Sequence, residues 1–333
     1  MLIGTRPLYD NLADAERFVP PPAWPVTLRA LERRLNVALL GPRGVGKTSL
    51  LRRLQLAMRD SKKPAAYVDA TAVEDVLELA ARIRDALLGQ PSPIVAAANL
   101  TAEAFRRQET QAGGASRALA SLLREIGQAD ATTILVDASS SAAACYELFG
   151  RMRDVLWQQD HEWVLAMDDV DRATALKPPA DAFFDSVIIL DPWATDALVE
   201  ILARRAEPGE DWPPDLLLSA ATGAHGSPRE AVRALSDAVV HGYDPATTLD
   251  ARAKLVDLAS AEGRPAGMLM AELLGRGQAS PSDEGLQKTL GVTRARLNQL
   301  FRQLLERGLV AADTERADGP GRPRTVYRPA LPQ

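Results

Sequence analysis

The chain has 333 residues, 46% of them hydrophobic and 25% charged, with a formal net charge of −5. This composition is typical of a soluble globular protein of two or three domains and excludes a disordered chain. No apolar run approaches the roughly 18–20 residues of a membrane span, and the N-terminus lacks the apolar region of a signal peptide. A single cysteine, Cys145, excludes a disulfide framework and a multi-cysteine metal site. We therefore expect a reduced, cytoplasmic protein.

The first motif along the chain is a phosphate-binding loop. An apolar run at 37–40 predicts a buried strand, the next eight residues (GPRGVGKT) fit G-x-x-x-x-G-K-[ST], and a helical pattern starts at Thr48. Glycines let the loop turn its backbone N–H groups toward phosphates, and the helix N-terminus adds a positive end. We expect Lys47 to bridge the β- and γ-phosphates of ATP and Thr48 to bind Mg²⁺. The predicted nucleotide-binding residues of this loop are Gly41, Pro42, Arg43, Gly44, Val45, Gly46, Lys47, Thr48 and Ser49.

Further strands and helices alternate after the loop, which predicts an α/β P-loop NTPase core with a parallel sheet. Helix 194–207 has Leu198, Ile201 and Leu202 on one face. The stretch 89–128 has a mostly helical pattern with a break at Gly113-Gly114, and no function follows from it. The predicted strands are 65–70, 132–139, 162–169 and 186–193, and the predicted helices between them are 73–88 and 143–158.

The segment TTILVDAS (132–139) raises the question of which strand carries the magnesium ligand. Its apolar run ends at Asp137, which we predict to bind Mg²⁺ and to act with Lys47 in catalysis. The alternative makes Asp168, in VLAMDDVD, the metal ligand. That assignment leaves only one later strand and makes TTILVDAS an unexplained extra strand, so strand counting favours Asp137.

The order of these segments resembles that of the AAA+ ATPases, in particular origin-recognition-complex subunits and archaeal replication initiators. The segments that carry the resemblance are GPRGVGKTSLL, TILVDAS, LDPWATDALVEILARRA and GAHGSPREAVRALSDAVV. The resemblance implies a small helical lid after the fifth strand and a Gly-Ser-Pro-Arg turn whose arginine, Arg229, reaches the γ-phosphate. Ser227 is suited to the N-cap and Pro228 to the first position of the helix that follows, which runs to Val240. A capping turn with a surface arginine is the alternative for Arg229.

Two departures from the family pattern bear on hydrolysis. Ala138 replaces the glutamate that orients the attacking water, and the segment 178–189 has no arginine to act as a finger toward a neighbour's γ-phosphate. Arg172 is the nearest arginine, and Asp168 or Asp169 could contact the water from the next strand. We expect ATP binding with turnover well below the typical median of about 10 per second, unless a second copy or a protein partner supplies the finger. If only the base is missing, Ala138→Glu is expected to raise turnover.

The C-terminal region is basic and resembles a winged helix-turn-helix. From Leu286 onward it carries nine Lys/Arg and four acidic residues, a net charge of +5 that leaves −10 on the rest of the chain. Helices are predicted at 268–274, 283–290 and 294–307, with the three-residue turn GVT before the last, followed by a hairpin wing from 308–315 and 324–331. LLERGLV and GRPRTVYR carry the resemblance to winged-helix regulators.

The resemblance implies that the third helix enters the major groove of duplex DNA and that the wing contacts phosphates or the minor groove. Leu297, Leu300, Leu304 and Leu305 should pack inward. A winged helix that docks a protein is the alternative, but the local charge favours DNA. The predicted DNA contacts are Arg294, Arg296, Asn298 and Gln299 on the helix, and Arg316, Arg322 and Arg324 on the wing.

The predicted organisation is an N-terminal segment with the AAA+ core at 1–193, a helical lid at 194–262 and a winged helix at 263–333. The predicted function is a replication-initiator-like ATP switch that binds double-stranded DNA, with ATP and Mg²⁺ as cofactors. Two alternatives stay open: a signalling (STAND-like) ATPase whose winged helix docks protein, and a transcription regulator in which ATP is structural.

Overall fold

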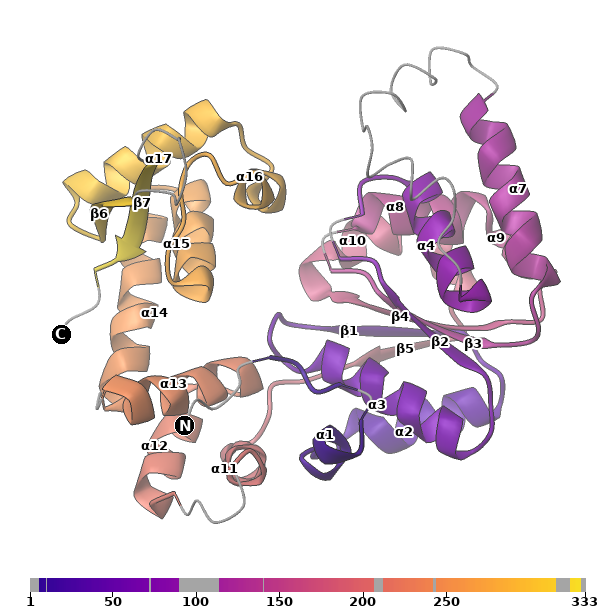
Figure 1. Cartoon of the computed structure of the whole chain (residues 1–333), viewed down its shortest axis with the longest axis horizontal. Helices are drawn as coiled ribbons and strands as arrows, with labels where there is room; N and C mark the ends of the chain where they lie inside the picture. Colours follow the sequence, from indigo (N-terminus) through magenta and orange to yellow (C-terminus); the bar gives the residue numbers. More distant parts are fainter. Residues whose placement is uncertain are drawn as a thin grey trace. The chain divides into compact units, whose positions relative to one another are not determined.

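The computed structural model describes residues 6–9, 11–71, 73–89, 114–139, 141–206, 212–241, 244–315 and 324–330 of the chain. Its residues group into two compact units (Figure 1). The first, called the P-loop unit, is drawn from Gly4–Trp212 and His225–Arg229, and the second, called the C-terminal unit, from Pro213–Ala224 and Glu230–Gln333. The three-part division of the chain expected from the sequence stays a prediction.

The P-loop unit is built on a parallel five-stranded sheet in the order β2-β3-β4-β1-β5. Its three inner strands are short runs of buried apolar residues, as expected of a parallel sheet covered on both faces. The parallel arrangement brings the carboxyl ends of β1, β3 and β4 to one edge, where open α/β sheets bind their ligands. The strands are β1 (Val37–Gly41), β2 (Ala65–Asp69), β3 (Thr133–Asp137), β4 (Glu162–Asp168) and β5 (Ser186–Ile189). The last four lie within the segments predicted, and β1 extends one residue beyond the predicted run at 37–40.

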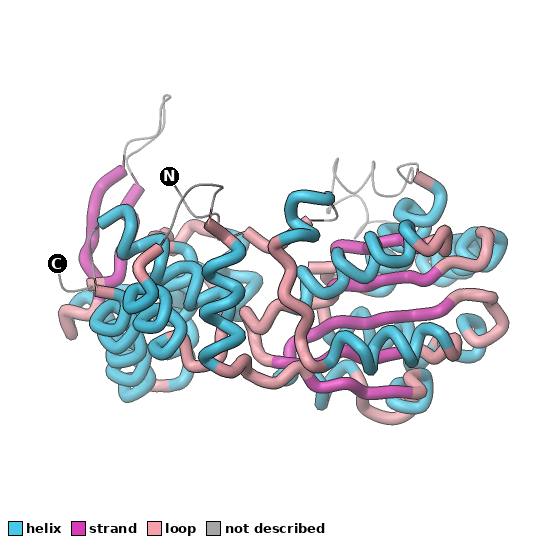
Figure 2. Tube along the Cα trace, turned by 90° about the horizontal axis from the view of Figure 1, so that it is seen from below, coloured by secondary structure: helices cyan, strands magenta, loops and turns pink. Residues whose placement is uncertain are grey.

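Helices cover both faces of this sheet, which the edge-on view makes clear (Figure 2). On one face, α2 (Ala23–Glu32) and α3 (Lys47–Asp60) pack on Leu39 and Leu135. On the other, α4 (Val76–Leu88), α7 (Gly114–Gln128) and the α8 region pack on residues such as Leu40 and Val136. The two apolar sets alternate along each strand because successive side chains point to opposite faces.

One predicted helix of the P-loop unit is interrupted. The segment expected to be a single helix at 143–158 divides into α8 (Ala142–Tyr146), a π-helical turn η1 (Glu147–Arg151) and α9 (Arg153–Leu156). The wider turn buries Leu148, Phe149 and Gly150 in succession, which a regular helix with one buried face does not do. The other short elements of the unit are α1 (Leu12–Glu16), η2 (Asp169–Asp171), α10 (Arg172–Ala175), η3 (Ala180–Phe183) and α11 (Thr195–Arg204).

The predicted apolar face of α11 is confirmed, because Leu198, Ile201 and Leu202 are all buried. Within the described part of the chain, no helix has the length and apolar character needed to cross a bilayer.

The C-terminal unit is helical and ends in an antiparallel hairpin. Its last three helices and the hairpin follow one another in the order predicted. Its apolar core includes Leu269, Leu273, Leu297 and Phe301. The first two residues of α13, Pro228 and Arg229, group with the P-loop unit and the rest of the helix with the C-terminal unit. The elements are α12 (Pro214–Gly223), α13 (Pro228–His241), α14 (Pro245–Ala261), α15 (Arg264–Arg276), α16 (Glu284–Leu290), α17 (Arg294–Glu306), β6 (Val310–Glu315) and β7 (Arg324–Pro329).

The predicted inward face of α17 needs one correction. Leu297, Leu300 and Leu304 are buried as expected, but Leu305 is 40% exposed and Phe301 is fully buried. Positions 297, 300, 301 and 304 follow the i, i+3, i+4, i+7 spacing of one helical face, whereas 305 lies beside it. Phe301 stacks on Tyr327 of β7, with ring centroids 4.4 Å apart, and so attaches the hairpin to the helix.

Candidate nucleotide-binding site

The loop between β1 and α3 has the backbone that its glycines predict. Gly44 and Gly46 have positive φ angles of 87° and 108°, a conformation that other residues rarely adopt. A Cβ atom at Gly46 would meet no atom within 4 Å, so the backbone angle, and not crowding, requires glycine there. Gly46 caps the N-terminus of the 14-residue helix α3, whose free N–H groups can bind an anion.

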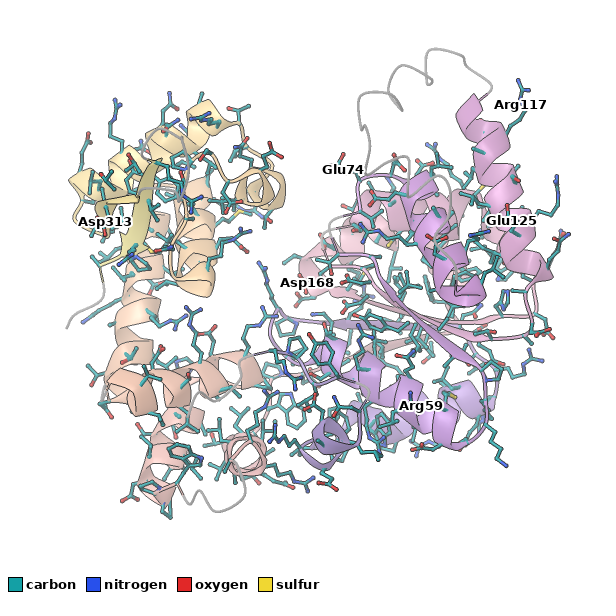
Figure 3. All side chains as sticks on the ribbon, viewed as in Figure 1. Arg59, Glu74, Arg117, Glu125, Asp168 and Asp313 are labelled. Atoms are coloured by element: carbon teal, nitrogen blue, oxygen red, sulfur yellow. The ribbon has the colours of Figure 1, made fainter. Side chains whose placement is uncertain are left out.

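Lys47 lies over this loop and is almost completely buried, with 5% of its side chain exposed. Its ammonium group donates to the carbonyl oxygens of Gly41 at 2.8 Å and Pro42 at 2.9 Å. It also forms an ion pair with the Asp168 carboxylate at 2.7 Å. Asp168 ends β4, opposite Gly41 in the register of the sheet, and is labelled in Figure 3. A phosphate that reaches Lys47 therefore competes with Asp168.

Asp137, at the end of β3, is buried beside the start of α3. Its Oδ2 accepts hydrogen bonds from the Thr48 hydroxyl at 2.6 Å and from the Tyr67 hydroxyl at 3.1 Å, whereas its Oδ1 is buried without a hydrogen-bond partner. Burial raises the pKa of the Asp137 carboxyl, and the two hydroxyl donors oppose that rise. Burial also raises the pKa of Tyr67, so its hydroxyl stays protonated and acts as a donor at neutral pH.

These groups suit a magnesium ion bound together with a nucleotide. Mg²⁺ is usually held by one or two carboxylates and by substrate phosphates and water. Here the Asp137 carboxylate accepts from the Thr48 hydroxyl with Oδ2, and its Oδ1 has no hydrogen-bond partner. Within the described residues, no group of three His, Cys, Asp or Glu side chains could hold a metal by itself. Asp137 and Thr48 would therefore hold the ion, which would neutralise phosphate charge, and the pairing of Asp168 with Lys47 disfavours the alternative ligand.

The Gly-Ser-Pro-Arg turn is attached to the phosphate-binding loop. The Arg229 N–H donates to the Gly44 carbonyl at 3.4 Å. Trp193 joins the two segments, because its backbone N–H donates to Gly226 O and its indole N–H donates to Val45 O, both at 2.9 Å. The Arg229 side chain is exposed, and its role as a γ-phosphate sensor stays a prediction.

Close packing explains the glycines on both sides of this contact. A Cβ at Gly44 would lie 3.0 Å from the Ser227 hydroxyl oxygen, and a Cβ at Gly226, where φ is 82°, would lie 2.5 Å from Pro192 Cβ. Trp193 was not among the predicted site residues, although it is the last residue of the segment predicted as the fifth strand. An indole can donate a hydrogen bond while its ring packs, so a tryptophan at that point was an available signal.

The structure corrects the expected effect of a glutamate at position 138. Ala138 is fully buried in the apolar cluster of the α4 face, together with Val68, Val73 and Val136. Asp137 points to the opposite face, toward α3, because neighbouring side chains alternate along a strand. A glutamate at 138 would extend from this apolar cluster, so we now expect Ala138→Glu to destabilise the P-loop unit and not to raise ATP turnover.

The remaining predicted residues of this site are placed as follows. Ser49 accepts a hydrogen bond from the backbone N–H of Leu8 at 3.2 Å, which attaches the N-terminal segment to α3. Arg43 is exposed on the loop, and Val45 is buried beneath it. Asp169 and Arg172 are exposed, at the start of η2 and α10 respectively.

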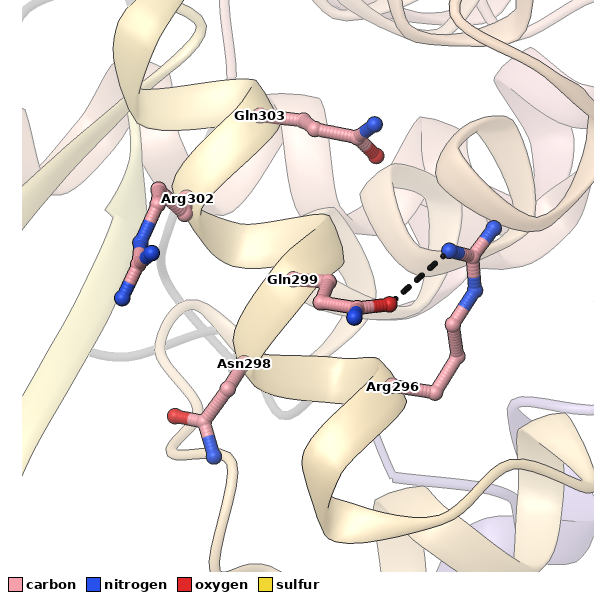
Figure 4. A pocket seen from close by; sticks show the side chains of 5 residues that line it. All are labelled: Arg296, Asn298, Gln299, Arg302 and Gln303. Carbon is pink, nitrogen blue, oxygen red and sulfur yellow. Dashed lines mark hydrogen bonds between the residues drawn. The ribbon is translucent and has the colours of Figure 1, made fainter.

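The predicted DNA contacts on α17 lie on its exposed face. Arg294, Arg296, Asn298 and Gln299 are all exposed. A hollow of about 250 Å³ lies along the helix (Figure 4), and it is lined by Arg296, Asn298, Gln299, Arg302 and Gln303. Arg302 and Gln303 were not among the predicted contacts. Both added residues lie four positions after a predicted contact, so helical spacing could have identified them.

Two contacts order this face of α17. Arg296 donates to the Gln299 side-chain oxygen at 3.1 Å (Figure 4). The Asn298 amide donates to the Arg294 carbonyl at 3.0 Å. On the hairpin, Arg324 is exposed at the start of β7. Arg316 and Arg322, the other two predicted contacts, lie outside the described residues.

The parallel sheet and the phosphate-binding loop give this chain a core with the fold of P-loop NTPases. Its fold is similar to that of the ORC1 protein of Aeropyrum pernix, whose structure was determined in complex with DNA: identity is 17%, 98% of this chain and 94% of that chain are covered, and the TM-score is 0.56. It is also similar to Cdc6p of Pyrobaculum aerophilum, with 16% identity, coverage of 98% and 93%, and a TM-score of 0.52. No protein-family model and no curated protein matches the sequence. The chain thus has an Orc1/Cdc6-like AAA+ fold.

Proposed function

We propose that this chain is a magnesium-dependent ATP switch that binds duplex DNA and resembles replication initiators. The observation that carries the nucleotide part is the convergence of Lys47, Thr48 and Asp137 at the carboxyl edge of the sheet. The ammonium group would bind the β- and γ-phosphates, and the hydroxyl and carboxylate would bind Mg²⁺. The backbone N–H groups of the glycine-rich loop would donate hydrogen bonds to the phosphates.

The same site is suited to holding ATP more than to hydrolysing it. Rapid turnover needs an oriented water and stabilisation of the charge that develops on the transferred phosphoryl group. Ala138 is buried on the other face of the sheet and cannot orient water, and Asp168 is engaged by Lys47. Hydrolysis would then be slow, or would depend on a second copy or a protein partner that supplies an arginine finger.

The C-terminal unit is the proposed DNA-binding part. Its helices α15, α16 and α17 with the β6–β7 hairpin have the element order of a winged helix. The lid predicted at 194–262 would consist of α12 to α14 together with α11 of the P-loop unit. The exposed face of α17 presents arginine, asparagine and glutamine, the side chains that read base edges in the major groove. The net charge of +5 from Leu286 onward supports a polyanionic partner. The complex of ORC1 from A. pernix with DNA agrees with this proposal.

Arg229 would connect the nucleotide to the DNA-binding part. It opens α13, and its backbone is attached to the phosphate-binding loop at Gly44. A γ-phosphate that attracts the exposed guanidinium would favour one position of this helix, and loss of the phosphate would release it. ATP and ADP would then stabilise different DNA-binding forms.

A gel shift on genomic duplex fragments with ATP, with ADP and without nucleotide tests this function. Binding that depends on the nucleotide is the expected result. Absence of DNA binding under all three conditions would instead favour the signalling ATPase whose C-terminal unit docks protein. Sequence-specific binding that ignores the nucleotide would favour a transcription regulator with structural ATP.

Replacing Arg296 and Arg324 together by alanine is expected to weaken duplex binding by at least roughly 30-fold, because each base contact of an arginine contributes about 1–3 kcal/mol and two arginines are removed. The slope of log affinity against log salt should also become shallower, because fewer counterions are released on binding. Fluorescence anisotropy of a labelled duplex over a salt series measures both.

The matched control replaces Lys254 and Arg264, two exposed cations of the C-terminal unit that lie on α14 and α15. This control removes the same number of positive charges, but from helices α14 and α15 instead of α17 and the hairpin. An equal loss of duplex affinity in the two double variants would mean that only the net charge of the unit attracts DNA. An affinity unchanged by Arg296→Ala with Arg324→Ala would contradict the proposed DNA surface.

A further inference from the structure

Tyr67 on β2 has a hydroxyl group that reaches the end of the neighbouring strand. In the parallel register, Tyr67 lies opposite Leu135 and Asp69 lies opposite Asp137. Tyr67 packs with the cluster on the α3 face, so its ring extends along the same face that carries the Asp137 carboxylate. The phenol is long enough to cover the distance of two residues, and its hydroxyl lies 3.1 Å from Asp137 Oδ2.

The ring of Tyr67 packs against a side chain of helix α3. The Arg52 guanidinium lies over it, 3.4 Å from the ring centroid. Arg52 follows Thr48 by four residues on α3, so the two side chains lie on one face of that helix. One helical face therefore supplies both a donor to Asp137 and the group that fixes the second donor.

The two hydroxyl groups act on the same carboxylate oxygen. Thr48 and Tyr67 both donate to Oδ2 of Asp137, and Oδ1 is left buried without a partner. A phenylalanine at position 67 would fill the same space without the hydroxyl, so packing alone does not account for the tyrosine. Two donors on one oxygen fix the carboxylate rotation and leave Oδ1 as the oxygen without a hydrogen bond.

We propose that Tyr67 is a positioning residue for the magnesium ion: it orients the Asp137 carboxylate so that Oδ1 is presented to the metal of the bound nucleotide. This inference rests on the proposed nucleotide site. It extends that site to a strand beyond the one that carries the metal ligand, and to a residue outside the phosphate-binding loop.

The test compares the affinity of a fluorescent ATP analogue in Mg²⁺ and in EDTA for the native chain, Tyr67→Phe and Tyr146→Phe. Tyr146 lies on α8 and packs against the cluster on the opposite face of the sheet, with its ring against Lys177. Tyr146→Phe removes the same hydroxyl from the same unit, far from the metal side of the site. Thermal unfolding without nucleotide checks that each variant is folded.

In Tyr67→Phe, the gain in affinity produced by Mg²⁺ should fall by roughly 10-fold, the effect of one hydrogen bond to a charged group. Its affinity in EDTA and both affinities of Tyr146→Phe should equal the native values. A merely structural role of the hydroxyl would lower binding equally in Mg²⁺ and in EDTA, and that result would overturn the inference. An unchanged Mg²⁺ effect in Tyr67→Phe would also overturn it. If the native chain bound no nucleotide, the proposed function itself would fail.

Discussion

Replacing Lys47 by methionine is expected to lower the affinity for ATP by at least about 30-fold. The ammonium group is buried and makes two hydrogen bonds to loop carbonyls as well as the ion pair with Asp168. Removing one member of a buried, hydrogen-bonded charge pair costs about 2–5 kcal/mol, and here the same group would bind the phosphates. Methionine retains the length of the buried stem, so a titration with a fluorescent ATP analogue reports the loss of the charge.

The same variant should also unfold more easily, because Asp168 is only 13% exposed and loses its partner. An uncompensated buried charge costs about 3–5 kcal/mol. Adding Asp168→Asn to Lys47→Met removes that charge, so it should restore most of the free energy of unfolding but not the ATP affinity. Lys63→Met, at an exposed position of the same unit, serves as the control. Native-like ATP binding by Lys47→Met would contradict the proposed phosphate site.

Ala138→Glu is expected to destabilise the P-loop unit by about 3 kcal/mol or more and to leave ATP turnover no higher than in the native chain. A carboxylate at this position would be buried in an apolar cluster without a partner, which is costly whether the group ionises or takes up a proton. Urea unfolding measures the stability, and phosphate release under saturating ATP measures the turnover.

Ala143→Glu is the matched control for this substitution. Ala143 is exposed on α8, a few residues along the chain, so the same change of residue should alter the free energy of unfolding by less than about 0.5 kcal/mol. A turnover of Ala138→Glu above that of the native chain would mean that the side chain reaches the nucleotide, and the assignment of the two sheet faces would then be wrong.

The sequence by itself determined the local features of this protein. The phosphate-binding loop, the strand positions and the order of helices and hairpin in the C-terminal region follow from motif spacing and apolar periodicity, which depend on neighbouring residues. The buried face of α11 was predicted for the same reason. The face of the sheet to which Ala138 points could also be predicted, because side chains alternate along β3 and Ala138 follows Asp137 directly.

Only the tertiary structure decided which of these residues meet. The sheet order places β2 beside β3 and β4 beside β1, and this brings Tyr67 to Asp137 and Asp168 to Lys47. Trp193 and the Gly226 turn meet the phosphate-binding loop in the same way, over long separations in sequence. Such contacts depend on strand order and register, which are set by the packing of the whole unit. Local sequence patterns do not predict such contacts, because nothing within the segment of either partner indicates which distant residue it will meet.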